Sequence, residues 1–183
     1  LTIILKRNDP TSAAKQVSLT ELGSIKINKE ERSKMYKTIP RSSIIGFLIG
    51  VLPGAGATIA SFLAYGMERN VVNDEEKEKF GKGSVNGLSA PETANNAACS
   101  GSFVPMLTLG IPGSGTTAVM LGALLGFGVQ PGPRLYMTNP EIFWSIIMSM
   151  YIGMVILLIL NLPLIPYIAR ILAVPKNYLI PLI

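Results

Sequence analysis

The chain carries one interrupted apolar pattern twice, as LPGAGAT at residues 52–58 and as IPGSGTT at residues 111–117. In both copies a Pro-Gly pair is followed by a second glycine two residues later and by a closing threonine. Proline removes a backbone donor and clashes with the preceding helical turn, so each copy predicts a break in a helix. The two copies together predict an internal repeat of two broken helices.

Both breaks lie inside long stretches that carry no formal charge. Residues 42–67, 93–133 and 142–169 contain no Asp, Glu, Lys or Arg, and each exceeds the ~20 residues that cross a bilayer. A soluble protein with buried helices would show a polar face at helical spacing, which residues 142–160 lack. We therefore predict an all-α polytopic membrane protein with broken or re-entrant helices, of the inverted-repeat secondary transporter type.

Charge is concentrated at one end of the chain. The formal net charge is +5, and all of the excess lies in residues 1–41. Lys and Arg prefer the cytoplasmic side of a membrane, so this segment is predicted to be a cytoplasmic basic connecting loop, with residues 29–37 as a candidate helix. A nucleic-acid patch is the competing interpretation, but only Tyr36 is interleaved as an aromatic. We predict a lipid environment and no nucleic-acid partner.

The remaining chain, residues 42–183, is predicted to be part of a transmembrane transport domain. The expected elements are broken helices at 42–67 and 93–129, a charged loop at 68–92, a membrane helix at 141–162 and the start of a further helix at 176–183. The apolar ends LTIIL and YLIPLI indicate a fragment of a longer chain.

Residue types that support common enzyme mechanisms are scarce. Cys99 is the single cysteine and there is no histidine, which excludes an intramolecular disulfide and disfavours zinc chemistry. Ser-His and Cys-His nucleophile pairs are excluded for the same reason. Only Glu92 is titratable near the apolar runs, so we predict no enzyme activity and no cofactor.

The paired breaks are the candidate site, because such segments present free backbone groups at the bilayer midplane of transporters. Free N–H groups at a helix start favour an anion, and neither span contains a basic side chain. A co-bound cation, Na⁺ or H⁺, is therefore expected near the paired amides. The alternative is that Gly and Pro only permit close packing. The predicted solute and ion site comprises Pro53, Gly54, Ala55, Gly56, Ala57, Thr58, Asn95, Asn96, Pro112, Gly113, Ser114, Gly115, Thr116 and Thr117.

Three smaller patterns add predictions. Asn95 and Asn96 are costly in an apolar run and are expected to face the protein interior, either at the site or as links between helices. Ser89 and Glu92 fit a capping box, with a coupling-ion ligand as the alternative for Glu92. Gly46-x-x-x-Gly50 and Gly122-x-x-x-Gly126 are assigned to tight helix contact.

Several longer motifs are shared with one known family. They are GVLPGAGATIASF at 50–62, FGKG at 80–83, APETANNA at 90–97, LTLGIPG at 107–113 and GVQPGP at 128–133. At these residues the chain resembles TctA, the large membrane subunit of the tripartite tricarboxylate transporters.

The resemblance implies a bacterial inner-membrane, multi-pass permease driven by an ion gradient instead of ATP. Its expected partners are a small membrane subunit, a periplasmic solute-binding protein and an organic acid solute. The alternative function is a channel-like or structural membrane subunit without a solute site of its own.

Overall fold

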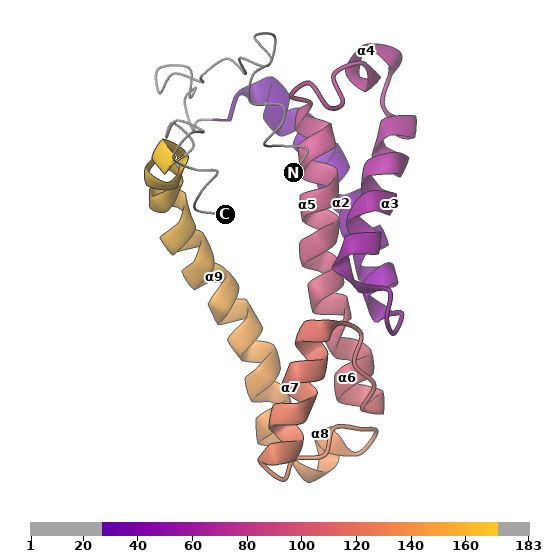
Figure 1. Cartoon of the computed structure of the whole chain (residues 1–183), viewed down its shortest axis with the longest axis vertical. Coiled ribbons are helices and arrows are strands. Elements are labelled where there is room, and N and C mark those ends of the chain that lie inside the picture. Colours follow the sequence, from indigo (N-terminus) through magenta and orange to yellow (C-terminus); the bar gives the residue numbers. More distant parts are fainter. Residues whose placement is uncertain (1–26, 172–183) are drawn as a thin grey trace, which may run out of the picture. The chain divides into compact units, whose positions relative to one another are not determined.

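The computed structural model describes residues 27–171, and side chains to residue 165. The predicted helix start at 176–183 lies outside these residues. Those described fall into two units, 27–148 and 149–171, each considered by itself. The helices are α2 (Lys29–Val51), α3 (Gly56–Val71), α4 (Asp74–Lys77), α5 (Val85–Gly101), α6 (Phe103–Leu109), α7 (Gly115–Gly126), α8 (Leu135–Thr138) and α9 (Pro140–Ile171) (Figure 1).

Helix α2 begins well before the apolar run. The backbone N–H of Asn28 donates to Glu31 Oε2 at 2.8 Å, which fixes the start of the helix. The helix then continues through Pro40 without a break. The basic residues from Lys29 onward therefore belong to the first helix, and the predicted loop boundary after residue 41 is not a structural boundary.

Helices α2 and α3 form an antiparallel hairpin. The chain reverses at the first Pro-Gly motif, and Glu68 near the end of α3 returns to Thr38 in the first half of α2. Thr38 Oγ1 donates to Glu68 Oε1 at 2.8 Å. The first broken helix thus has both of its ends on the same side (Figure 1).

Helix α5 packs in parallel against α2 with a constant register. Asn86 Nδ2 donates to Thr38 Oγ1 at 2.8 Å, and a Cβ added to Gly46 or Gly50 would lie 2.6 Å from the Cα of the facing Ala94 or Ala98. The partners in each pair are 48 residues apart. The predicted tight contact at Gly46 and Gly50 is confirmed.

The core of this three-helix group consists of alanines. Small side chains let helix backbones approach closely, and here they come from α3 and α5. The buried set is Ala60, Ala64, Ala90, Ala94 and Ala98. By contrast, a Cβ on Gly122 or Gly126 would meet nothing within 4 Å among the described residues, so tight contact at that second glycine pair is not found.

The connection between α3 and α5 is shorter than predicted. Helix α3 runs on to Val71 and α5 starts at Val85, so residues 68–92 are largely helical. Asn73 caps α4, because its Oδ1 accepts the Glu76 N–H at 3.1 Å. Ser84 caps α5 by accepting the N–H of Gly87 at 3.0 Å. The predicted capping box at Ser89 is wrong, because Ser89 lies in the second turn of a helix that is already capped.

The second broken element contains two interruptions where one was predicted. Helix α5 ends at Gly101, α6 follows after Ser102, and the motif at 111–117 separates α6 from α7. A second apolar cluster joins α6 to the segment after α7 and to the first turns of α9. Its buried members are Met106, Leu107, Val129 and Leu135.

Helix α9 extends beyond its predicted end at residue 162. It runs through Pro163 and position 166 to Ile171, because a proline removes one backbone donor without ending every helix. Its stretch Pro140–Ile165 contains an 18-residue window with a mean hydropathy of 2.4. Among the described residues it is the one helix long and apolar enough to cross a membrane.

Candidate functional site

The first motif forms an open turn at the tip of the α2–α3 hairpin. Gly54 has φ +81° and Gly56 φ +68°, a left-handed conformation that disfavours residues with a Cβ. A Cβ on either glycine would meet no atom within 4 Å. Their glycine identity therefore follows from backbone conformation and not from crowding.

The start of α3 at this motif has no side-chain cap. Ala55 occupies the N-cap position with φ −68° and ψ −43°, a helical conformation. Thr58, in the first turn, is exposed. The first-turn N–H groups of α3 are therefore left to solvent or to a ligand.

The second motif folds back along α6 and packs tightly. The N–H of Ile111 donates to the carbonyl oxygen of Pro105 at 3.2 Å. Gly113 is buried, and a Cβ there would lie 2.8 Å from Ser102 Cβ and 3.2 Å from the carbonyl oxygen of Gly50. The second motif thus touches α2 two residues before the first motif begins.

Helix α7 starts with a reciprocal cap. Ser114 Oγ accepts the N–H of Thr117 at 3.2 Å, and Thr117 Oγ1 accepts the N–H of Ser114 at 2.8 Å. Thr117 is buried, whereas Gly115 and Thr116 are exposed. Helix α7 thus starts with a side-chain cap, whereas Ala55 at the start of α3 offers no side-chain oxygen.

Asn95 and Asn96 do not face the interior of the described residues. Both are exposed, whereas Ala94 and Ala98 of the same helix are buried against α2. Asn96 Nδ2 donates to the Glu92 carbonyl oxygen at 2.9 Å. The two amides lie within one helical turn of Ala98, which packs on Gly50, and they form part of an exposed polar face of α5.

Sequence reasoning missed a group of side chains at the other end of the hairpin, which we call the polar layer: Thr38, Arg41, Ser42, Glu68 and Asn86. Glu68 is fully buried, and its Oε1 accepts from Arg41 Nη2 at 2.7 Å and from Asn86 Nδ2 at 3.1 Å, besides Thr38. From the sequence, Glu68 is predicted to belong to the charged loop at 68–92.

A sequence signal for the polar layer does exist. Residues 38, 42, 46 and 50 of α2, 60, 64 and 68 of α3, and 86, 90, 94 and 98 of α5 are all buried and recur every fourth position. This spacing places each set on one helix face. Reading the small residues together with the polar ones at the same spacing would have identified Glu68 as buried.

A separate set of ion pairs lies beyond the polar layer. Lys34 Nζ is 2.8 Å from Glu76 Oε2 and 2.9 Å from Glu30 Oε1, which ties α2 to α4. The hydrogen bond from Lys34 lowers the pKa of Glu76, and the two carboxylates raise the pKa of Lys34. These ion pairs stabilise the end of the α2–α3 hairpin that lies away from the first Pro-Gly motif.

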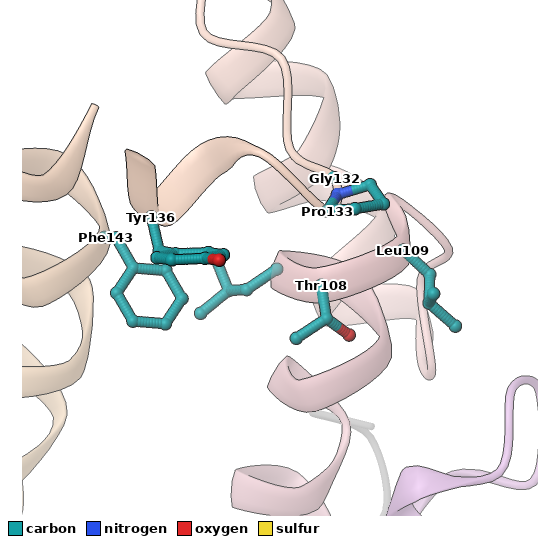
Figure 2. Close-up of a pocket in the computed structure, with 7 residues that line it drawn as sticks. Thr108, Leu109, Gly132, Pro133, Tyr136 and Phe143 are labelled. Carbon is teal, nitrogen blue, oxygen red and sulfur yellow. The ribbon is translucent and has the colours of Figure 1, made fainter. Parts of the chain in front are cut away.

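A shallow cavity of about 360 Å³ lies near the end of α6. Figure 2 shows Tyr136 and Phe143 on one side of it and Leu109 and Pro133 on the other. Its lining is apolar apart from the Thr108 and Tyr136 hydroxyls, and Thr108 Oγ1 already donates to the Val104 carbonyl oxygen at 2.6 Å. No predicted site residue lines this cavity. Within the part of the chain that the structure describes, no three His, Cys, Asp or Glu side chains gather as metal ligands.

Comparison with known proteins identifies the family. The sequence model of the tripartite tricarboxylate transporter TctA family matches residues 1–183. The chain belongs to the TctA family. It is 40% identical over 177 residues to an uncharacterised 52.8 kDa protein in the TAR-I ttuC' 3' region of Agrobacterium vitis. It is 46% identical over 138 residues to an uncharacterised protein in the TAR-II ttuC' 3' region of the same organism.

These relatives are longer than the chain. The first alignment covers 97% of the chain and 35% of the relative, and the second covers 75% and 56%. The chain thus spans about a third of one relative and about half of the other. No solved structure matches it.

Proposed function

We propose that the chain is part of the membrane permease subunit of a tripartite, ion-gradient-driven transporter for tricarboxylates or related organic acids. The contact between Gly113 and Gly50 supports this most directly, because it brings the second Pro-Gly motif to the hairpin tip that carries the first. The TctA family supports the transport class and a non-enzymatic role. The small membrane subunit, the periplasmic solute-binding protein and a multi-pass inner-membrane location belong to the same proposal.

Helix lengths fit a membrane placement in which the hairpin is re-entrant. Ten residues of α2 follow Arg41, which is ~15 Å of helix, or half of a ~30 Å hydrocarbon core. Helices α5 and α6 together cover residues 85–109, about 37 Å, enough to cross completely. The two motifs then meet near the midplane, where discontinuous helices of transporters bind their solutes.

An anionic solute suits the groups that these motifs offer. The uncapped start of α3 carries roughly half a positive charge on its free N–H groups. Thr58 and Thr116 add exposed hydroxyls that can donate to a carboxylate. Because neither motif contains a basic side chain, a co-transported Na⁺ or H⁺ offsets the solute charge, and Asn95 and Asn96 lie one turn from the meeting point.

The test is uptake of labelled citrate and a panel of dicarboxylates by the full-length permease with its partner subunits. Thr58→Ala and Thr116→Ala are the informative variants, since both side chains are exposed and neither is part of the α7 cap. Loss of one hydrogen bond to a carboxylate should raise KM for the preferred solute by about tenfold. Thr138→Ala, an exposed threonine on α8, is the matched control and should transport like wild type.

The structural alternative finds specific support at Gly113, whose surroundings exclude a side chain whether or not a solute binds. If both threonine variants transport with wild-type KM at normal expression, the motifs serve packing. The subunit would then be channel-like or structural, with any solute site elsewhere.

A further inference from the structure

The two carboxylate oxygens of Glu68 are in unequal surroundings. Oε1 accepts from Thr38, Arg41 and Asn86 at 2.7 to 3.1 Å. Oε2 is buried and has no partner, and the same holds for Asn86 Oδ1. Two buried acceptors therefore have no hydrogen-bond partner, as do the buried Arg41 Nε and Ser42 Oγ of the same layer, a costly state for polar groups away from water.

A single proton on Glu68 Oε2 would change this balance. It converts Oε2 from an acceptor into a donor, and the layer already offers acceptors in Asn86 Oδ1 and in Ser42 Oγ, which also has no partner. A metal cation in the same place would sit beside the Arg41 guanidinium, which repels it.

The charged surroundings of Glu68 are simple. Helix α2 contributes Arg41, whose Nη2 is 2.7 Å from Glu68 Oε1, and α5 contributes the neutral Asn86. The next charged groups outward are Lys34 and Glu76, which pair with each other. One acid and one base thus make up the charge of the layer, so adding a proton to Glu68 leaves Arg41 as its only net charge.

We propose that Glu68, and not a site near Asn95 and Asn96, binds the coupling cation and that this cation is a proton, an inference that rests on the proposed transport function. The proton passes from a hydronium ion of the aqueous phase to Oε2: one O–H bond of the hydronium breaks, a water molecule leaves, and the carboxyl O–H bond forms. Ionised Glu68 holds Arg41 and fastens α3 to α2; protonated Glu68 loses that ion pair. Because both helices carry the first Pro-Gly motif at their other end, proton binding is linked to the hairpin that contacts the solute.

The test compares two transport modes of the full-length permease with its partner subunits in proteoliposomes. Counterflow of labelled citrate at equal pH needs no gradient, whereas accumulation is driven by a one-unit pH gradient. One proton per solute gives about tenfold accumulation in the wild type. Glu68→Gln, which resembles the protonated acid, should keep counterflow and lose accumulation. Glu78→Gln, an exposed acid beyond α4, is the matched control and should keep both.

A second variant tests the proposal independently of Glu68. Arg41→Gln removes the cation that pairs with the ionised carboxylate, so proton-driven uptake should extend to higher pH than in the wild type. This measurement also decides the matter if Glu68→Gln fails to reach the membrane.

Three results would overturn the proposal while leaving transport itself intact. They are full pH-driven accumulation by Glu68→Gln, loss of accumulation in Glu92→Gln instead, and uptake driven by a Na⁺ gradient with no response to pH. Absence of both counterflow and accumulation in the wild type would count against the proposed function as a whole.

Discussion

The two Pro-Gly motifs have nearly the same sequence and different structures. The first is an exposed turn with left-handed glycines and an uncapped helix start. The second is packed against Ser102 and Gly50 and opens a helix with a reciprocal Ser114–Thr117 cap. Two motifs with similar sequences therefore do not give equivalent residues the same structural role.

The difference separates two reasons for a glycine. At Gly54 the side chain is absent because the backbone has φ +81°, although space is available. At Gly113 the backbone is ordinary and the space is missing. The first motif is thus arranged to expose backbone groups, and the second to bring two helices together.

The largest effect is expected where a new side chain meets packed atoms. Gly113→Ala places a methyl group 2.8 Å from Ser102 Cβ, and overpacking of this kind costs about 1 to 3 kcal/mol. Thermal unfolding of the purified subunit should show a clear drop in midpoint. Gly115→Ala, at a position with open space and an ordinary φ, is the matched control and should leave the midpoint nearly unchanged.

A second substitution tests whether the Ser102 Cβ causes this loss of stability. In a Gly113→Ala background, Ser102→Gly deletes the Cβ in closest contact and should restore part of the lost stability. Equal loss in Gly113→Ala and Gly115→Ala would show that the two motifs are not packed differently.

A smaller loss is expected at the first motif, from strain alone. Gly54→Ala forces a Cβ into a left-handed conformation at a cost of roughly 1 to 2 kcal/mol. Gly54→Asn should cost less, because asparagine tolerates that conformation better. Chemical denaturation of the three proteins checks the order, and an alanine variant as stable as wild type would contradict the left-handed turn.

Exchanging serine and alanine at the two helix starts should change stability at one of them only. Ser114→Ala removes the α7 cap and should cost about 1 kcal/mol. Ala55→Ser places a serine at the position of Ser114 in the second motif, but Ala55 has helical angles instead of the extended ones of an N-cap. We expect no gain in stability from it. A clear gain would mean that the two helix starts are equivalent.

The smallest effect is expected far from both motifs, at the Lys34–Glu76 pair. The pKa of Glu76 is lowered in the folded protein. Ionised Glu76 therefore stabilises the fold at pH values above its ordinary pKa of 4.5, and this stabilisation is lost as the pH falls through the lower folded pKa. The pKa of Lys34 is raised in the folded protein. Charged Lys34 therefore stabilises the fold at pH values below its ordinary pKa of 10.5, and this stabilisation is lost as the pH rises through the higher folded pKa. Glu76→Gln should therefore flatten the decline of stability below about pH 4.5, measured by unfolding across pH, without changing solute uptake.

Much of the helical framework followed from the sequence. The proline positions predicted where α2 and α6 end, and the uncharged run at 142–169 predicted α9. The Gly46-x-x-x-Gly50 spacing predicted a tight helix contact, although not that α5 is the partner. These features depend mainly on residues close together in the sequence, so a pattern within one segment predicts them.

The remaining features depend on contacts between segments. The reversal at the first motif and the return of the second to Gly50 are tertiary events with almost identical local sequences. Glu68 was missed because burial of an acid depends on partners from two other helices, 27 and 18 residues away. Asn95 and Asn96 were expected inside, yet their helix turns its alanines toward α2.

The central claim, that the two motifs share one solute site, is tested most directly by solute protection. Single cysteines at Thr58, Thr116 and Thr138 would be introduced into full-length permease lacking other cysteines, and the rate of alkylation measured with and without citrate. The account predicts that citrate slows alkylation at the first two positions and not at the third. Protection at neither motif, in protein that still transports citrate, would contradict it.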